Sequence, residues 1–377
     1  MIIRLLARFF ASWSTPVVLR AGRVLGAIWF HVIRVRRGVA ERAVARAFPE
    51  KTRDEVRAIV KGNFQHLMIS LLESLAYVAY PEARLRQLIK MEGVEIAVVE
   101  PRSQGRGIVA ISAHIGNFEM CTDACGLLYE FPMIIVARLP KGGFARAMLD
   151  AFRGRNHRME VFEPKGSGPK VLEAFRTKQS VLAFVIDQNL RRGRGVFVPF
   201  LGEIANTTTG FASLLRKSGA GFCVVQMYRE SDGTHRLHVT PVPPSDHPNM
   251  RVGMINDTLT MSNHIQSFVR AHPEQWFWVH RRWKARPEAG DLVRTDAGLE
   301  RFGQGRVTAV LTNATPQALA LPSAVEAIRR LRDAGVAVVH GEQSADPGTL
   351  VADAASPDLV ETVDRFLEKV VSVQEAI

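Results

Sequence analysis

The chain has 377 residues, of which 47% are hydrophobic. This length and composition exclude a wholly disordered protein and predict one large folded domain with an appendage. The formal net charge of +12 at pH 7 indicates an anionic partner, such as a nucleic acid, an anionic lipid or an acidic protein. The three cysteines form no C-x-x-C pair, which favours a reducing compartment and argues against a structural zinc site.

Residues 1–46 combine nine Arg and one acidic residue with many aromatic and aliphatic side chains. Their longest uncharged runs, residues 9–19 and 24–33, are shorter than the roughly 20 residues that a membrane-spanning helix needs. We therefore expect basic amphipathic helices that lie in a membrane interface and contact anionic lipids. Helices that only cap a soluble core, and a membrane-spanning segment, are the alternatives.

Residues 47–286 are expected to form the main domain, because strand and helix patterns alternate along them. Such alternation predicts an α/β fold with a mixed central sheet flanked by helices. Helices are predicted at residues 52–79, 118–129, 144–152, 169–177, 210–218 and 254–271. Strands are predicted at residues 108–113, 133–137, 159–162, 181–186, 196–200, 222–228 and 236–240, the last two as a hairpin.

Residues 287–377 differ in charge from the rest of the chain. They contain eight Arg or Lys and fourteen Asp or Glu, a net charge of −6, which leaves +18 for the first 286 residues. Strands at 307–311 and 336–340, a helix at 323–333 and a last helix opened by Ser356-Pro357 predict a small β-α-β-α extension. Neither strand is followed by a Gly-rich loop, so we assign the extension no catalysis.

The strand at residues 108–113 is followed by a Gly-containing turn that carries His114, with Glu119 five residues later. A His at a strand end can take a proton from a hydroxyl, and a nearby carboxylate can fix its tautomer and stabilise the imidazolium. A second polar residue, Asp187, ends the strand at 181–186, and ligands bind at such strand ends in α/β sheets. The alternative is a satisfied His–Glu pair without function. The sequence contains no P-loop, H-E-x-x-H, G-x-G-x-x-G or nucleic-acid motif, so we expect neither a metal site nor nucleic-acid binding.

Residues 114–119, His-Ile-Gly-Asn-Phe-Glu, resemble the H-x4-D/E motif of glycerolipid-type acyltransferases. In the form H-x-G-N-F/W-E they resemble the late acyltransferases of lipid A biosynthesis, of the lauroyl and myristoyl transferase type. The resemblance extends from about Met1 to Arg286. Further matching stretches, in order, are Phe48-Pro49-Glu50, Arg153-x-Arg155, Asp187-Gln188, residues 195–202, residues 207–210, and residues 272–284.

The resemblance implies transfer of a fatty acyl chain to a hydroxyl of a lipid or glycolipid acceptor at the cytoplasmic face of the bacterial inner membrane. The donor would be an acyl-carrier-protein thioester or, less often, an acyl-CoA, with no other cofactor. His114 would be the general base and Glu119 the carboxylate that orients it. Asn117 would shape the turn or help to stabilise the oxyanion. The acceptor hydroxyl would attack directly, because the motif offers no nucleophile for an acyl-enzyme.

The same resemblance assigns cationic and polar residues to substrate binding. Arginine forks suit phosphates of the acceptor or of the donor's phosphopantetheine arm, although solvated helix ends are the alternative. Lys165 stands near the position where the family often has a further Arg. Asp187 would orient one of the arginines or line the site. The expected substrate-binding residues are Asn117, Arg138, Arg153, Arg155, Lys165, Asp187 and Gln188.

The positive charge of residues 1–286 suits an acidic acyl carrier protein and anionic membrane lipids as partners. Two other functions are compatible with the sequence. A catalytically silent lipid-binding or scaffold protein could keep the same fold, and a thioesterase would use the same site with water as the acceptor.

Overall fold

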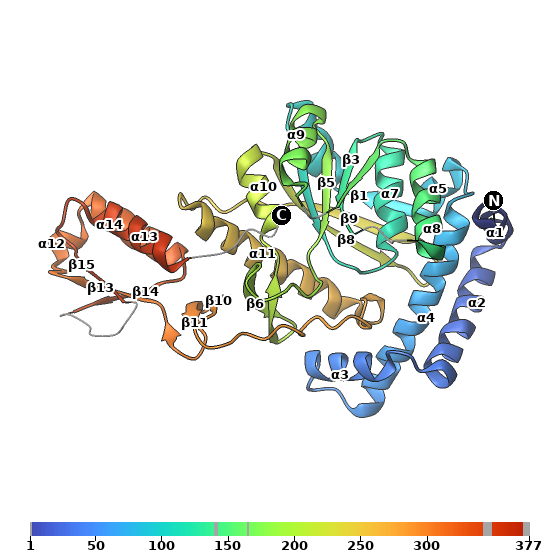
Figure 1. Ribbon diagram of the computed structural model, residues 1–377, viewed down its shortest axis with the longest axis horizontal. Coiled ribbons are helices and arrows are strands. Elements are labelled where there is room, and N and C mark those ends of the chain that lie inside the picture. Colours follow the sequence, from blue (N-terminus) through green and yellow to red (C-terminus); the bar gives the residue numbers. More distant parts are fainter. Residues whose placement is uncertain (1, 139–141, 164–165, 342–348, 372–377) are drawn as a thin grey trace.

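The N-terminal part of the protein is a group of helices built on one long helix (Figure 1). A computed structural model describes residues 2–138, 142–163, 166–341 and 349–371. The helices are α1 (Ile2–Ala11), α2 (Thr15–Ile28) with its last wide turn η1 (Trp29–Ile33), α3 (Arg37–Ala47) and α4 (Arg53–Tyr77). A capping box starts α4, since Thr52 and Glu55 each accept a hydrogen bond from the other's backbone N–H.

Helix α2 packs closely against α4 because it presents two glycines to it. A Cβ atom added at Gly22 would lie 2.4 Å from Ile69 Cγ1, and one at Gly26 would lie 2.3 Å from Gln65 Cα. The outward side of α2 and η1 is apolar and exposed, notably at Val24 and Val32. Residues 15–33 form a 19-residue helix that is long and apolar enough to cross a membrane; an 18-residue stretch of it has a mean hydropathy of 1.4, and 28% of that stretch is buried.

A seven-stranded mixed sheet forms the centre of the molecule, as the sequence predicts. Its strand order is β1-β9-β8-β2-β5-β3-β4, and all neighbours are parallel except the hairpin β8–β9. The carboxyl ends of β2, β5 and β3 therefore meet at one edge. The strands are β1 (Ile89–Glu92), β2 (Ile108–Ser112), β3 (Met133–Val136), β4 (Met159–Phe162), β5 (Val181–Val185), β8 (Gly221–Arg229) and β9 (His235–Pro241).

Helices cover both faces of this sheet, because alternate side chains of each strand point to opposite faces. Val109 and Ile111 of β2 pack with α9 (Gly168–Lys178), α10 (Gly210–Ser218) and α11 (Met250–Ala271). Ile108 and Ala110 pack in a second core that contains α7 (Phe118–Leu128) and α8 (Gly143–Arg155). Short elements α5 (Glu82–Leu88), η2 (Glu95–Val99) and α6 (Glu100–Ser103) precede β2, and η3 (Pro273–Gln275) follows α11.

A second sheet connects the main domain to the residues beyond 286. Its order is β12-β11-β10-β6-β7, and β10 pairs with β6 in parallel at Val293 and Phe197. Apolar side chains on both sides of residue 286, such as Ile255 and Leu331, share one core. The strands are β6 (Val196–Phe200), β7 (Glu203–Thr207), β10 (Leu292–Thr295), β11 (Gly298–Arg301) and β12 (Gly305–Arg306).

The C-terminal unit lies at the opposite end of the molecule from the N-terminal helices (Figure 1). Its parallel sheet has the order β14-β13-β15 and contains one strand more than the sequence predicts, β15 (Leu350–Asp353). The last helix begins at Leu359 rather than at Pro357, because the Ser356 hydroxyl accepts the Asp358 N–H in a turn before the helix. The other elements are β13 (Thr308–Thr312), α12 (Pro316–Leu319), α13 (Pro322–Asp333), β14 (Ala337–His340) and α14 (Leu359–Val370).

Candidate functional site

The turn after β2 is held by backbone hydrogen bonds to the segment that follows α11. The Gly116 N–H donates to Gln275 O, and the Phe277 N–H donates to His114 O. Gly116 has a φ of 63°, and a Cβ atom there would lie 2.8 Å from Met227 O, so only glycine fits without strain. These constraints fix the position of His114 at the carboxyl edge of the sheet.

Asp187 is the hydrogen-bond partner of the His114 imidazole. His114 Nδ1 lies 2.7 Å from Asp187 Oδ1, and the His114 backbone N–H donates to Asp187 Oδ2 at 2.8 Å. Trp276 Nε1 donates to the same Oδ2 at 2.6 Å. The two residues meet because β2 and β5 are neighbouring parallel strands, with Ser112 opposite Val185. Asp187, which is buried, thereby holds the imidazole in one tautomer and one orientation.

This arrangement corrects the sequence-based expectation for both carboxylates. Among the described residues Glu119 makes no hydrogen bond with His114; instead it lies on the first turn of α7 and lines the same cavity. Asp187 was expected to orient an arginine or to line the site; it lies in the site, but its described side-chain hydrogen-bond partners are His114 and Trp276 rather than an arginine. Five residues of separation put Glu119 on a helix beyond the turn, whereas the adjacent strand end brings Asp187 directly against the ring.

The two carboxylates near His114 favour the protonated form of its imidazole. Burial alone would lower the pKa of His114, but the charge and hydrogen bond of Asp187 and the charge of Glu119 raise that pKa above its ordinary value. Burial would raise the pKa of Asp187, but the charge of His114 and hydrogen bonds from His114 and Trp276 bring it to about 2. Burial raises the pKa of Glu119.

An apolar cavity of about 480 Å³ opens beside His114. His114, Glu119 and Gln188 contribute its polar groups near the imidazole, and side chains of β3, β4, β5 and α7 form its walls. A smaller cavity of about 40 Å³ shares Ser112, Thr122 and Ala183 with it and lies deeper between the sheet and α7. The wall residues include Ile135, Val136, Leu149, Met159, Val161, Ala183, Phe184, Val185 and Phe277.

Gln188 lies against the other nitrogen of the imidazole. Because Nδ1–H donates to Asp187, Nε2 is an acceptor, and Gln188 Nε2 donates to it at 2.9 Å. The Gln188 carbonyl accepts from Arg282 Nη1, and the Asn189 N–H donates to His280 Nε2. Residues 280–282 thus position the segment that covers His114.

Asn117 is buried behind the turn and acts as the N-cap of α7. Its Oδ1 accepts from the Met120 N–H, and its Nδ2 donates to Glu73 Oε2 at 3.0 Å and to Ser70 O at 3.3 Å. These contacts support the expected role in shaping the turn, and they leave its amide committed rather than directed at an oxyanion. Glu73 also accepts from Arg229 of β8.

The buried network around Glu73 was not found from the sequence. Arg229 donates to Glu73 and contacts His66 Nδ1 at 2.7 Å, while His66 Nε2 lies 3.2 Å from Gly116 O. Gln275 accepts from the Arg229 N–H and donates to the Arg229 carbonyl. His66 and Arg229 alone are 163 positions apart in the chain, so no local spacing could signal that these residues support the same turn.

The four basic residues expected to bind substrate, Arg138, Arg153, Arg155 and Lys165, do not form one group in the structure. Arg138 is exposed and follows β3 at the edge that carries His114. Arg155 donates to the carbonyls of Tyr77 and Val78 at the end of α4, and lines a separate cavity next to α1. Its contacts cap a helix, so the expectation of phosphate binding finds no support there. Lys165 lies outside the described residues, as does the side chain of Arg153.

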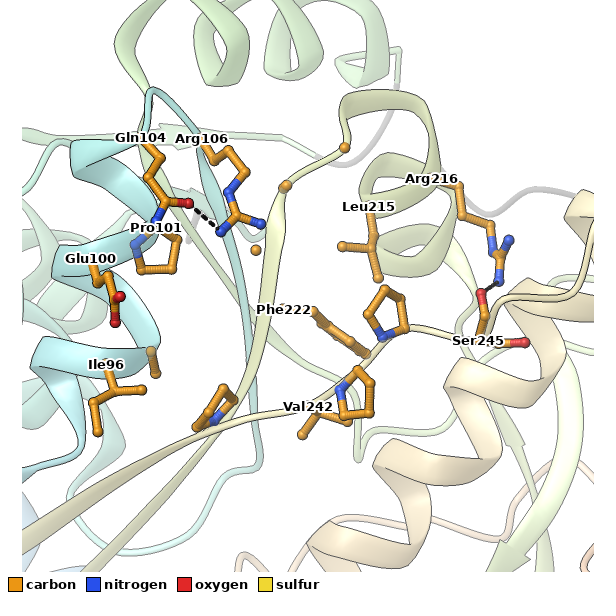
Figure 2. A pocket seen from close by; sticks show the side chains of 17 residues that line it. Ile96, Glu100, Pro101, Gln104, Arg106, Leu215, Arg216, Phe222, Val242 and Ser245 are labelled. Atoms are coloured by element: carbon orange, nitrogen blue, oxygen red, sulfur yellow. Dashed lines mark hydrogen bonds between the residues drawn. The ribbon is translucent and has the colours of Figure 1, made fainter.

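A larger cavity, of about 790 Å³, lies at the opposite edge of the sheet (Figure 2). Its polar side chains bind within the protein: Arg106 donates to Gln104, and Arg216 donates to Ser245 O. None of the candidate catalytic residues lines it. Within the part of the chain that the structure describes, no group of three His, Cys, Asp or Glu residues could hold a metal ion.

Comparison with known proteins identifies the family. Residues 3–285 match the model of bacterial lipid A biosynthesis acyltransferases. The chain belongs to this family. It is 27% identical over 277 residues to the lipid A biosynthesis palmitoleoyltransferase of Escherichia coli K12, covering 72% of this chain and 86% of the relative. It is also 27% identical over 278 residues to the lauroyltransferase of that strain, with coverages of 72% and 87%.

The family match confirms the resemblance and the enzyme class that the sequence analysis stated. A Haemophilus influenzae lipid A biosynthesis acyltransferase is a more distant relative, 22% identical over 280 residues. Members of the family are O-acyltransferases, and the matched region contains His114, Glu119 and Asp187. It ends at residue 285, so the extension beyond it lies outside the family match.

Proposed function

We propose that this protein transfers a fatty acyl chain from a thioester donor to a hydroxyl of a lipid A precursor, with His114 as the general base. The observation that carries the proposal is the pair formed by His114 and the buried Asp187 at the mouth of an apolar cavity. An imidazole with a fixed tautomer can accept a hydroxyl proton, and an apolar cavity beside it can hold the chain whose carbonyl carbon is attacked.

In the proposed reaction the acceptor hydroxyl replaces the Gln188 amide at His114 Nε2. The hydroxyl oxygen attacks the thioester carbon while its proton moves to Nε2, and the imidazolium is stabilised by Asp187 and Glu119. The tetrahedral intermediate then expels the thiolate, which takes the proton from Nε2 as it leaves. An ester bond forms, a thioester bond breaks, and His114 returns to its neutral form.

The N-terminus of α7 supports the intermediate in this scheme. The Ile115 and Gly116 N–H groups are already committed, since they donate to Ala113 O and Gln275 O. The N–H groups of Phe118 and Glu119 belong to the first turn of α7, where a helix leaves its N–H groups without internal partners. They are the donors that we assign to the oxyanion.

The acyl donor and the cell membrane are both expected partners. The +18 charge of residues 1–286 favours an acidic acyl carrier protein as the carrier of the thioester, with acyl-CoA as the second possible donor. Exposed Val24, Ile28 and Val32 on α2 and η1 supply the apolar surface for a membrane contact. We place the enzyme at the cytoplasmic face of the bacterial inner membrane, where both substrates would meet.

The deciding experiment incubates the purified full chain with acyl carrier protein thioesters and a lipid A precursor, and measures products by mass spectrometry. Wild-type protein should add one acyl chain, and His114→Ala should add none while keeping its thermal unfolding transition. Release of free fatty acid without acylated product would instead identify a thioesterase. Donor binding without any turnover would identify a silent scaffold, and either outcome would overturn the proposal.

A further inference from the structure

A cationic cavity of about 310 Å³ lies between α3 and the segment that follows Trp278. We call it the α3 cavity. Five cationic side chains and no carboxylate line it. Concave sites with one sign of charge concentrate ligands of the opposite sign. The lining residues are Val39, Arg42, Ala43, Arg46, His280, Arg281, Arg282, Trp283 and Lys284.

Most of the charge in the α3 cavity has no counter-charge within the described chain. Arg42, Arg281 and Lys284 are exposed, and the described residues offer their side chains no acidic or hydrogen-bonding partner. Arg46 lies 3.5 Å from Glu203, which also binds Arg286 at 2.6 Å. Among the described residues, Glu203 is thus the carboxylate that forms an ion pair with a cation of this cavity, and Asp187 acts on Arg282 through its charge without a hydrogen bond.

Arg282 is the strongest indication of a missing anion. Its side chain is 1% exposed, yet among the described residues its hydrogen-bond acceptors are the neutral oxygens of Gln188, Asn206 and Thr207. Burial lowers the pKa of this guanidinium to about 10. Its Nε, and Nε1 of the neighbouring Trp283, are buried donors without a partner in the described structure. Buried cations and orphaned donors both cost stability until an acceptor satisfies them.

The α3 cavity lies on the far side of Gln188 from His114. Gln188 donates from its side chain to His114 Nε2 and accepts through its carbonyl from Arg282. His280, which lines the cavity, holds the Asn189 N–H at 2.8 Å. The imidazole thus borders the apolar cavity directly and is connected to the α3 cavity through Gln188 and Arg282, the first cavity suited to a hydrocarbon chain and the second to an anion.

We propose that the α3 cavity binds a phosphate group of the acyl acceptor and thereby places the acceptor hydroxyl at His114 Nε2. This inference rests on the proposed function and adds a subsite to it. Arginine forks bind phosphate oxygens in pairs, and a lysine adds a point charge. The enclosed volume suits one phosphate group with adjoining sugar atoms rather than the surface of an acidic protein. The donor's phosphopantetheine arm carries the same chemistry, so the test separates the two sources.

The test uses the full chain with three substitutions, Arg42→Gln, Arg281→Gln and Lys284→Gln. The matched control carries Arg251→Gln, Arg332→Gln and Lys369→Gln, which remove the same charges from exposed positions on α11, α13 and α14. Initial rates are measured with a phosphorylated glycolipid acceptor and with the same acceptor after phosphatase treatment. Thermal unfolding verifies that both variants are folded.

We expect the cavity variant to raise KM for the phosphorylated acceptor by roughly 10- to 100-fold, the effect of losing hydrogen bonds to a charged group. For the cavity variant, KM for the donor and the rate with the dephosphorylated acceptor should stay within about twofold of wild type. For the control variant, KM for the phosphorylated acceptor should also stay within about twofold of wild type. A raised donor KM would assign the cavity to the donor's arm, and equal losses with both acceptors would exclude a phosphate site. Either result overturns the inference.

A binding measurement separates this inference from the proposed function. Micelles that contain the phosphorylated glycolipid or its dephosphorylated form are titrated into His114→Ala protein, with and without the three cavity substitutions. Phosphate-dependent binding that the substitutions remove supports the subsite even if no acyl transfer is detected. Binding that ignores the phosphate overturns it even if transfer is observed.

Discussion

Asp187 contacts His114 through both of its carboxylate oxygens, with Oδ1 2.7 Å from the ring Nδ1 and Oδ2 accepting the backbone N–H at 2.8 Å. One carboxylate therefore fixes both the side chain and the backbone of the candidate base. Trp276 holds the same Oδ2, so the carboxylate itself is constrained. Removing its charge should affect catalysis more than folding.

We predict that Asp187→Asn lowers kcat by roughly 100- to 10,000-fold, the range expected when a general base loses its tautomer and its counter-charge. KM for the acceptor should change little, because Asp187 is buried behind the ring. Steady-state kinetics measure kcat and KM for the acceptor separately. Trp276→Phe, which removes one hydrogen bond to Asp187 together with part of a buried core side chain, is the comparison and should lower kcat less than Asp187→Asn does. A kcat within tenfold of wild type in Asp187→Asn would contradict the proposed orientation.

The pH profile should report the raised pKa of His114. A general base acts in its neutral form, so kcat/KM should rise with pH through a pKa above the ordinary 6.5. Glu119→Gln removes a charge that raises this pKa, and should move the ascending limb to lower pH. A limb that stays in place would show that Glu119 does not act on His114 through its charge.

The same pKa shifts imply opposite contributions to stability. The raised pKa of His114 contributes stability below pH 6.5 that is lost as pH rises through the folded-state value. The Asp187 pKa of about 2 contributes stability above its ordinary value of 3.8 that is lost as pH falls toward 2. Urea unfolding across pH, for wild type and His114→Ala, should show the alkaline loss only in wild type.

Arg229→Met should destabilise the fold strongly, because it leaves the Glu73 carboxylate buried without its cation. Breaking a buried ion pair on one side costs about 3–5 kcal/mol of unfolding free energy. Adding Glu73→Gln should recover part of that loss. Lys178→Gln, which breaks the exposed pair with Glu160, should cost less than about 1 kcal/mol. Urea denaturation measures the free energy of unfolding of the single variant, the double variant and Lys178→Gln. Equal losses in all three would contradict a special role for the buried pair.

Ala183→Leu should shorten the acyl chain that the enzyme accepts, because Ala183 lines both the apolar cavity and its deeper extension. Each methylene kept out of an apolar site costs about 0.8 kcal/mol, or roughly fourfold in kcat/KM. Competition among donors of different chain length measures the preference. Short donors are the internal control and should react as with wild type. An unchanged preference would show that the chain occupies another site.

Val24→Ser, Ile28→Ser and Val32→Ser together should weaken binding to anionic vesicles, because these exposed side chains offer apolar surface to the membrane. Cosedimentation measures the bound fraction. The control replaces three exposed apolar residues of the C-terminal unit, Leu321, Val325 and Val339, and should bind as wild type does. Equal binding by all three proteins would indicate that membrane contact uses another surface.

The sequence by itself determined the family and six of the seven strands of the central sheet, namely β2, β3, β4, β5, β8 and β9. Apolar strands such as Ile108–Ser112 and the helix after His114 can be predicted because their residue patterns involve only positions close together in the chain. Short strands such as β1, β10 and β15 were missed, because four residues leave no periodic signal, whether the strand lies at a sheet edge, as β1 and β15 do, or inside a sheet, as β10 does.

Only the tertiary structure decided which residues act together. Asp187 is 73 residues from His114, and it reaches the ring because β5 lies beside β2 in the sheet. Arg155 could be either a phosphate ligand or a helix cap until its contacts with the end of α4 were known. Arg42 and Arg282 line one cavity although nearly all of the main domain lies between them in the chain. These distances depend on strand order and on how the helices pack. They therefore cannot be predicted from the types and spacing of residues that are neighbours in the chain.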